Sequence, residues 1–257
     1  MLLWAWVFAL AASGPNGPRQ HARLARSRHA ARPTPRMGDT EAPIPRWREL
    51  DPGLAEGATR LWIESVVVGK GLCPFAHTVR GAPTRVVTTD YAPGERRELL
   101  ELIGAEVERL AATDSQTPAT TLVLLTHEAF GVFDTYMEEA AIEAQDVACQ
   151  LTDGAIQVVQ FHPHARWGAL KEAADYSTRS PVPMLHLLRD SDVVQAERDW
   201  VRAHGSEERA PDIQQTNAAM LRGMGLDAAH GMWERSLEAA RRAESERSCR
   251  APAEPRT

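Results

Sequence analysis

Cysteine is scarce in this chain of 257 residues, which contains only Cys73, Cys149 and Cys249. The three form no CxxC pair and no even-numbered framework that could staple a small fold. The sequence therefore does not indicate a disulfide scaffold, and we expect reduced thiols in a reducing compartment.

Lysine is scarce as well. Lysine occurs only at Lys70 and Lys171, and the net charge is −6. Residues 1–38 contain six Arg and no Asp or Glu, so the remaining 23 basic and 35 acidic residues give the rest of the chain a charge of −12. Because a nucleic-acid binder needs a basic face that neutralises phosphates, this balance argues against a nucleic-acid partner.

No apolar run is long enough to cross a bilayer. The run MLLWAWVFALAA at residues 1–12 has about eleven apolar residues, whereas a spanning helix needs about 20. Residues 13–37 are rich in Arg, Ala, Pro and His and lack acids, as organelle transit peptides do. We expect residues 1–45 to be a removable leader and linker. Import into a plastid is favoured over a mitochondrion, with secretory targeting by the apolar run as an alternative, and we expect no membrane partner after leader removal.

The familiar catalytic signatures are missing as well. The sequence contains no P-loop, no dinucleotide-binding glycine fingerprint, no GxSxG and no HExxH. The candidate functional residues therefore come from less specific groups of reactive side chains.

Hydrophobic periodicity is what the chain does contain. It predicts helices over residues 51–69, 95–112 and 130–150, one that begins at Ser191, and one over 211–222. Short apolar runs predict strands at residues 85–89, 120–126, 155–161 and 184–188.

The resulting order, α-β-α-β-α-β-β-α-α, predicts a single-domain layered structure of the α/β or α+β class over residues 46–238. Its central sheet would have about four strands with helices packed on it. Parallel pairing fits the first three strands, and a ferredoxin-like antiparallel sheet stays open. We expect residues 239–257 to be a frayed or disordered tail.

Three histidines lie at the end of the third predicted strand or within the fourth. His162 and His164 follow the third strand, and His186 lies in the fourth. With Cys73, on the loop after the first helix, His162 and His186 form a candidate catalytic set and a candidate ligand set for a divalent metal such as zinc. The spacing matches no strong zinc motif. The alternative for each His is a hydrogen bond to backbone at a strand end, and for Cys73 a buried structural thiol.

A second group of side chains suits an anion. Arg179 and Ser180 lie in a polar loop, and Arg189 ends the fourth predicted strand. The planar guanidinium fork matches a carboxylate or phosphate, so these three are candidate residues for binding a small anionic ligand. The alternative is that Arg179 pairs with Asp175 or Asp190 and merely locks the loop.

Several blocks of sequence resemble an uncharacterised family, domain of unknown function 1415. The resemblance covers about residues 62–226 and rests most on the blocks LCPFA from Leu72, FHP from Phe161 and RSPVPMLHLLR from Arg179. This chain departs from the family pattern at three positions, where Gly71 and Thr178 replace Asn and His164 replaces Asp. The last departure makes His164 a poor candidate for an obligatory ligand. The resemblance implies no established activity.

The hypothesis that the sequence favours is an enzyme that acts on a small anionic metabolite through a Cys/His/Arg pocket. Two alternatives are a metal- or ligand-binding module without turnover, and a structural or assembly protein. A more distant alternative comes from the string CPFAHTVR at residues 73–80, which is similar to the active-site turn of glutathione transferases with a catalytic Cys. In that family a strand precedes the Cys, whereas here a helix is predicted before it.

Overall fold

The computed structural model describes residues 52–73, 84–168, 170–205 and 212–250. The predicted leader lies outside these residues, and so do the end of the LCPFA block and the rest of the CPFAHTVR string. In the part of the chain that is described, no helix is both long and apolar enough to cross a membrane.

Four strands form one mixed sheet in the order β1-β2-β4-β3. Strand β1 (Thr84–Thr89) pairs with β2 (Thr120–Leu125) in parallel, while β4 (Met184–Arg189) is antiparallel to both β2 and β3 (Ile156–Phe161). The four predicted strands are confirmed. The parallel pairing expected for the first three holds for β1 and β2 only, because β4 lies between β2 and β3. The antiparallel ferredoxin-like alternative is replaced by this mixed sheet.

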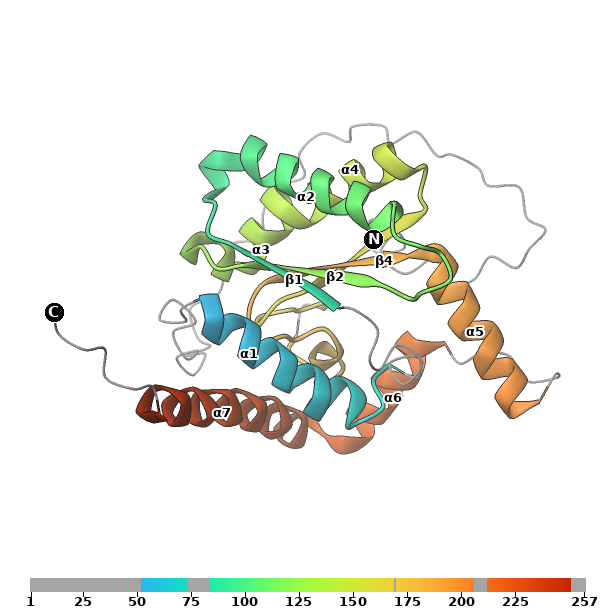
Figure 1. The fold of residues 1–257 in the computed structure, drawn as a ribbon. Helices are drawn as coiled ribbons and strands as arrows, with labels where there is room; N and C mark the ends of the chain where they lie inside the picture. Colours follow the sequence, from blue (N-terminus) through green and yellow to red (C-terminus); the bar gives the residue numbers. More distant parts are fainter. Residues whose placement is uncertain (1–51, 74–83, 169, 206–211, 251–257) are drawn as a thin grey trace, which may run out of the picture. The chain divides into compact units, whose positions relative to one another are not determined.

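One face of the sheet is covered by helices α2 (Arg96–Ala111), α3 (Phe133–Tyr136) and α4 (Ile142–Thr152), which lie above it in Figure 1. Successive strand residues point to opposite faces, so every second side chain meets these helices. The buried cluster on this face includes strand residues Val123, Leu125, Ile156, Val158, Leu185 and Leu187. Each such side chain contributes roughly 1.5–3 kcal/mol when fully buried.

The other face is covered by α1 (Pro52–Trp62), α6 (Ile213–Met224), α7 (Leu226–Arg250) and the 3-10 segment η7 (Ala173–Ser177). Leu122, Leu124 and Met184 point into this second cluster. The domain is therefore a sheet between two helical layers, as the layered class predicted. His186 shares the face of Met184, so it lies on this second side.

Two of the predicted helices contain a segment that is π-helical instead of α-helical. Helix α1 continues as a π-helix, η3 (Ile63–Val68), and a second π-helix, η6 (Met137–Ala141), interrupts the predicted helix over 130–150. Hydrophobic spacing cannot reveal such local widening of the turn. Short 3-10 segments, η4 (Pro93–Glu95) and η5 (Glu128–Gly131), precede α2 and α3.

Two helices in the C-terminal part of the domain also differ from the sequence-based expectations. Helix α5 (Asp190–His204) starts directly after β4, with Arg189 instead of Ser191 as its N-cap. Helix α7, which was not among the predicted helices, runs to Arg250 and so extends into residues 239–257, where a frayed or disordered tail was expected. Its later turns are rich in Glu, Arg and Ala, which are good helix formers, and an exposed Glu238–Arg242 pair at i,i+4 adds a small contribution.

Candidate functional site

His162 follows β3 and is completely buried. The backbone N–H of His164 donates to its Nδ1 at 2.9 Å, so the ring proton sits on Nε2, which donates to the carbonyl oxygen of Phe130 at 2.8 Å. Burial lowers the pKa of His162 to about 3, and the nearby charge of Arg179 acts in the same direction. His162 is thus a neutral imidazole with both nitrogens engaged, which joins the end of β3 to η5.

His186 occupies the middle of β4. The Thr120 hydroxyl donates to the Leu187 carbonyl at 2.9 Å, so it accepts from Nε2 of His186 at 2.6 Å. Burial lowers the pKa of His186 to about 4. The ring lies beside Phe161, with centroids 6.3 Å apart. His186 is therefore neutral, and its bonded nitrogen helps to hold β4 against β2.

The predicted Cys/His metal set is not brought together. Cys73, His162 and His186 all belong to the described ranges, and within those ranges no three His, Cys, Asp or Glu side chains lie close enough to hold a metal ion. Both nitrogens of His162 are already bonded, which is the physical reason that it cannot serve as a ligand in this arrangement.

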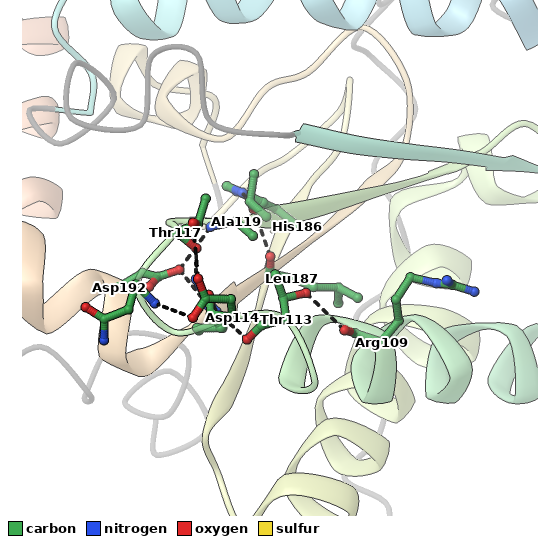
Figure 2. A network of polar contacts seen from close by, with 11 residues as sticks. Arg109, Thr113, Asp114, Thr117, Ala119, His186, Leu187 and Asp192 are labelled. Atoms are coloured by element: carbon green, nitrogen blue, oxygen red, sulfur yellow. Dashed lines mark hydrogen bonds and ion pairs between the residues drawn. The ribbon is translucent and has the colours of Figure 1, made fainter.

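Arg189, predicted to bind ligand, is instead committed to the fold. Its side chain is almost fully buried, and Nε donates to Asp192 Oδ2 at 2.8 Å. The terminal nitrogens donate to the backbone carbonyls of Thr113, Asp114 and Thr117 at 2.5–3.0 Å. Figure 2 shows how this network gathers the loop after α2 against the start of α5. Arg189 thereby fixes that loop and leaves little capacity for a ligand.

Ser180, the second predicted anion-binding residue, has a similar structural role. Its hydroxyl donates to the carbonyl of Val182 at 2.5 Å, and its own carbonyl accepts a long bond of 3.4 Å from Trp233 Nε1. The first bond closes a turn within the chain that enters β4, and the second ties that chain to α7. The hydroxyl proton is therefore unavailable to a ligand unless this turn rearranges.

Arg179 has different surroundings, although it is equally buried. Both arginines are 5% exposed. Nε of Arg179 donates to the Ala165 carbonyl at 3.2 Å, and Nη1 donates to the Tyr176 hydroxyl at 3.2 Å. Its guanidinium carbon also lies 4.5 Å from the Tyr176 ring centroid. All of these partners are neutral.

The expected alternative for Arg179, a carboxylate that locks it, is not found within the described ranges. Asp175 accepts instead from the backbone N–H groups of Trp167 and Glu172, and Asp190 accepts from Gln157. A buried cation whose hydrogen-bond partners are neutral is costly, because a buried charge is ordinarily paired with an opposite one.

A chain of polar groups leads from Arg179 towards the surface. The Tyr176 hydroxyl lies 2.9 Å from His230 Nδ1, and His230 Nε2 lies 3.1 Å from Glu234 Oε1. Tyr176 is buried, while the His230 side chain is 35% exposed. We name Arg179, Tyr176, His230 and Glu234 the Arg179 cluster. It joins the segment before β4 to α7.

The sequence did not point to His230 or Glu234. Their spacing places them one turn apart on a helix, but this is a common surface arrangement and carries no functional signal. Nothing in the sequence links them to Tyr176, which is 54 positions upstream of His230.

Helix α6 brings the Cys73 loop to the same side of the sheet. Asn217 on α6 donates to the carbonyl of Leu72 at 2.6 Å, and Arg222 pairs with Glu172 at 3.0 Å, just before η7. Leu72 and Tyr176 also share the second buried cluster. Helix α6 therefore contacts both Leu72, the neighbour of the partly buried Cys73, and η7, which carries Tyr176 of the Arg179 cluster.

These features define a layered α/β domain with a buried arginine and a Tyr–His–Glu chain on its second face. The family model described as protein of unknown function (DUF1415) matches residues 55–230, and the chain belongs to this family. The resemblance seen in the sequence is thereby confirmed. Comparisons with curated proteins and with solved structures found no match.

Proposed function

We propose that this domain is an enzyme that binds a small anionic metabolite at Arg179. The observation that carries the proposal is the buried guanidinium of Arg179, whose partners are a carbonyl and a phenol. An oxyanion would compensate the buried charge, and the guanidinium fork fits a carboxylate or phosphate through two parallel hydrogen bonds.

Comparison with Arg189 supports this assignment. Among the described residues, Arg189 makes four hydrogen bonds, one of them to the carboxylate of Asp192, whereas Arg179 makes two, both to neutral groups. A guanidinium has five N–H donors, so Arg179 retains most of its donor capacity towards an external anion. In this proposal Arg179 binds the ligand, while Arg189, which was also predicted to bind it, has the structural role.

Cys73 remains the proposed reactive side chain, because its neighbour Leu72 contacts the same helix α6 that packs against η7, where Tyr176 lies. A thiolate near a cation can act as a nucleophile towards an electrophilic carbon of the bound metabolite. His162 would support the site by fixing the end of β3, because both of its nitrogens are occupied. Import into a plastid likewise stays a prediction for the leader.

Anion binding is tested by calorimetric titration of the protein with sulfate, phosphate and a series of small di- and tricarboxylates. We expect at least one of them to bind, and Arg179→Met to weaken that binding at least tenfold because the charged fork is lost. Arg198→Met, which removes an exposed arginine from α5, is the matched control and should leave the affinity unchanged. Equal affinities in the wild type and Arg179→Met would overturn the proposed site.

Turnover is tested separately with a pool of anionic metabolites and mass-spectrometric detection of products. If the domain is an enzyme that uses Cys73, Cys73→Ser should abolish product formation while the affinity for the anion changes little. Anion binding at Arg179 with no product from any ligand in the pool would instead favour a binding module.

A further inference from the structure

We infer that Tyr176, His230 and Glu234 form a proton relay that serves the anion bound at Arg179. This inference rests on the proposed function and adds to it the groups that exchange a proton with the ligand. Tyr176 is the proposed catalytic residue, and His230 and Glu234 act through it.

The Tyr176 hydroxyl is the junction of the relay. It lies 3.2 Å from Nη1 of Arg179 and 2.9 Å from Nδ1 of His230. Since a guanidinium can only donate, the phenol oxygen accepts from Arg179. The single phenolic proton is left for one of two acceptors: the imidazole, or an anion held by the remaining N–H groups of Arg179.

The charge of His230 decides between these acceptors. In the neutral ring Nδ1 accepts the Tyr176 proton, and Nε2–H donates to Glu234. In the imidazolium both nitrogens carry protons, so Nδ1–H donates to the phenol oxygen and the phenolic proton must turn elsewhere. Nε2–H donates to Glu234 in this form as well. Protonation of His230 therefore directs the Tyr176 hydroxyl towards the anion.

The complete transfer balances without any change of oxidation state. The Tyr176 O–H bond breaks as its proton passes to an oxygen or carbon of the ligand, and Nδ1–H of His230 passes its proton to the phenol oxygen. His230 is left neutral with its remaining proton on Nε2, and once its contact with Tyr176 opens, Nδ1 regains a proton from solvent, which the 35% exposed side chain can reach. The net result is one proton moved from solvent to the ligand.

The surroundings of the relay favour this direction. Burial raises the pKa of Tyr176, so its hydroxyl stays protonated and acts as a donor. The Trp233 ring stacks on the His230 ring with centroids 6.2 Å apart, and it meets the Tyr176 ring edge-on with centroids 6.5 Å apart. These contacts fix the orientation of the His230 and Tyr176 rings. A fixed donor geometry is what general acid catalysis requires.

The relay predicts that binding of an anion is coupled to proton uptake by the protein. Sulfate is the probe, because it does not itself titrate near neutral pH. Calorimetric titrations of the full chain in buffers of different ionisation enthalpy measure the protons taken up per sulfate bound. We expect net uptake in the wild type, and loss of most of that uptake in His230→Gln and in Tyr176→Phe.

The matched control is His127→Asn, which removes an imidazole outside the cluster and keeps an N-cap at η5. It should take up as many protons as the wild type. Arg179-dependent sulfate binding with the same proton uptake in His230→Gln as in the wild type would overturn the relay while leaving the anion site intact.

If sulfate does not bind, the hydrogen bond between Tyr176 and His230 can still be tested in the ligand-free protein. By proton NMR, the wild type should show a slowly exchanging Tyr176 hydroxyl proton with a nuclear Overhauser contact to the His230 ring, absent in Tyr176→Phe. Failure of sulfate to bind counts against the anion site. Absence of this hydroxyl signal counts against the relay, whatever the outcome with sulfate.

Discussion

Replacement of Arg189 by Met is expected to lower the free energy of unfolding by about 3–5 kcal/mol, the cost typical of breaking a buried ion pair. The substitution leaves the partly buried carboxylate of Asp192 without its cation and removes the donors that meet three loop carbonyls. Buried polar groups that lose their partners are more destabilising than hydrogen bonds that never form. Urea unfolding followed by far-UV circular dichroism measures the change.

Arg202→Met is the matched control for this prediction. Arg202 pairs with Asp199 across the same i,i+3 spacing on α5, but its side chain is 75% exposed. Such pairs contribute about 0–1 kcal/mol, so the control should change stability little. A comparably small effect of Arg189→Met would show that the network in Figure 2 does not hold the loop.

Arg179→Met should behave in the opposite way in the ligand-free protein. Because the partners of Arg179 among the described residues are neutral, its removal strands none of their carboxylates and replaces a buried charge by an apolar chain. Such replacements are often neutral or stabilising. Unfolding measured beside Arg189→Met therefore separates a structural arginine from one kept for a ligand, and a loss as large as that of Arg189→Met would argue for a structural role of Arg179.

The second large effect concerns pH. The pKa of His162 is about 3 in the folded protein, whereas an unfolded histidine titrates near 6.5. Between these values the unfolded chain binds a proton that the folded protein does not, so stability falls as the pH drops below about 6.5. His162 alone should remove about 2–3 kcal/mol of stability between pH 7 and pH 4.5.

His162→Gln isolates this contribution. Gln cannot be protonated, so the gap in unfolding free energy between wild type and variant should shrink by about 2–3 kcal/mol from pH 7 to pH 4.5. At pH 7 the variant is expected to be about 1–3 kcal/mol less stable, because it loses part of the bridge between Phe130 and the His164 backbone. A gap that stays constant with pH would contradict the buried neutral imidazole.

Local pattern predicted the four strands because each is a short apolar run, and Val123 and Leu185 are buried as such runs require. It did not predict that β4 inserts between β2 and β3. That order depends on residues 162–183, an irregular connection whose path is set by contacts such as the bond from the His162 N–H to the Thr178 carbonyl. No periodicity encodes such contacts.

The residue types in the sequence pointed to several side chains that are buried and hydrogen-bonded in the structure. They did not reveal the role of each side chain. Arg179 and Arg189 lie in one sequence block and look alike as anion-binding residues. Only the folded chain shows that Arg189 meets Asp192 and a loop 72–76 positions upstream, while Arg179 meets Tyr176. The polarity of a side chain is local information, whereas its partners are decided by tertiary contacts.

The central claim is that Arg179 holds a small anion, and a crystal structure of the protein soaked in selenate tests it most directly. The anomalous signal of selenium locates the anion without reference to its chemistry. We predict a selenate within hydrogen-bond distance of both the Arg179 guanidinium and the Tyr176 hydroxyl. Selenate bound only at exposed arginines, or a carboxylate of the chain itself seated against Arg179, would contradict the claim.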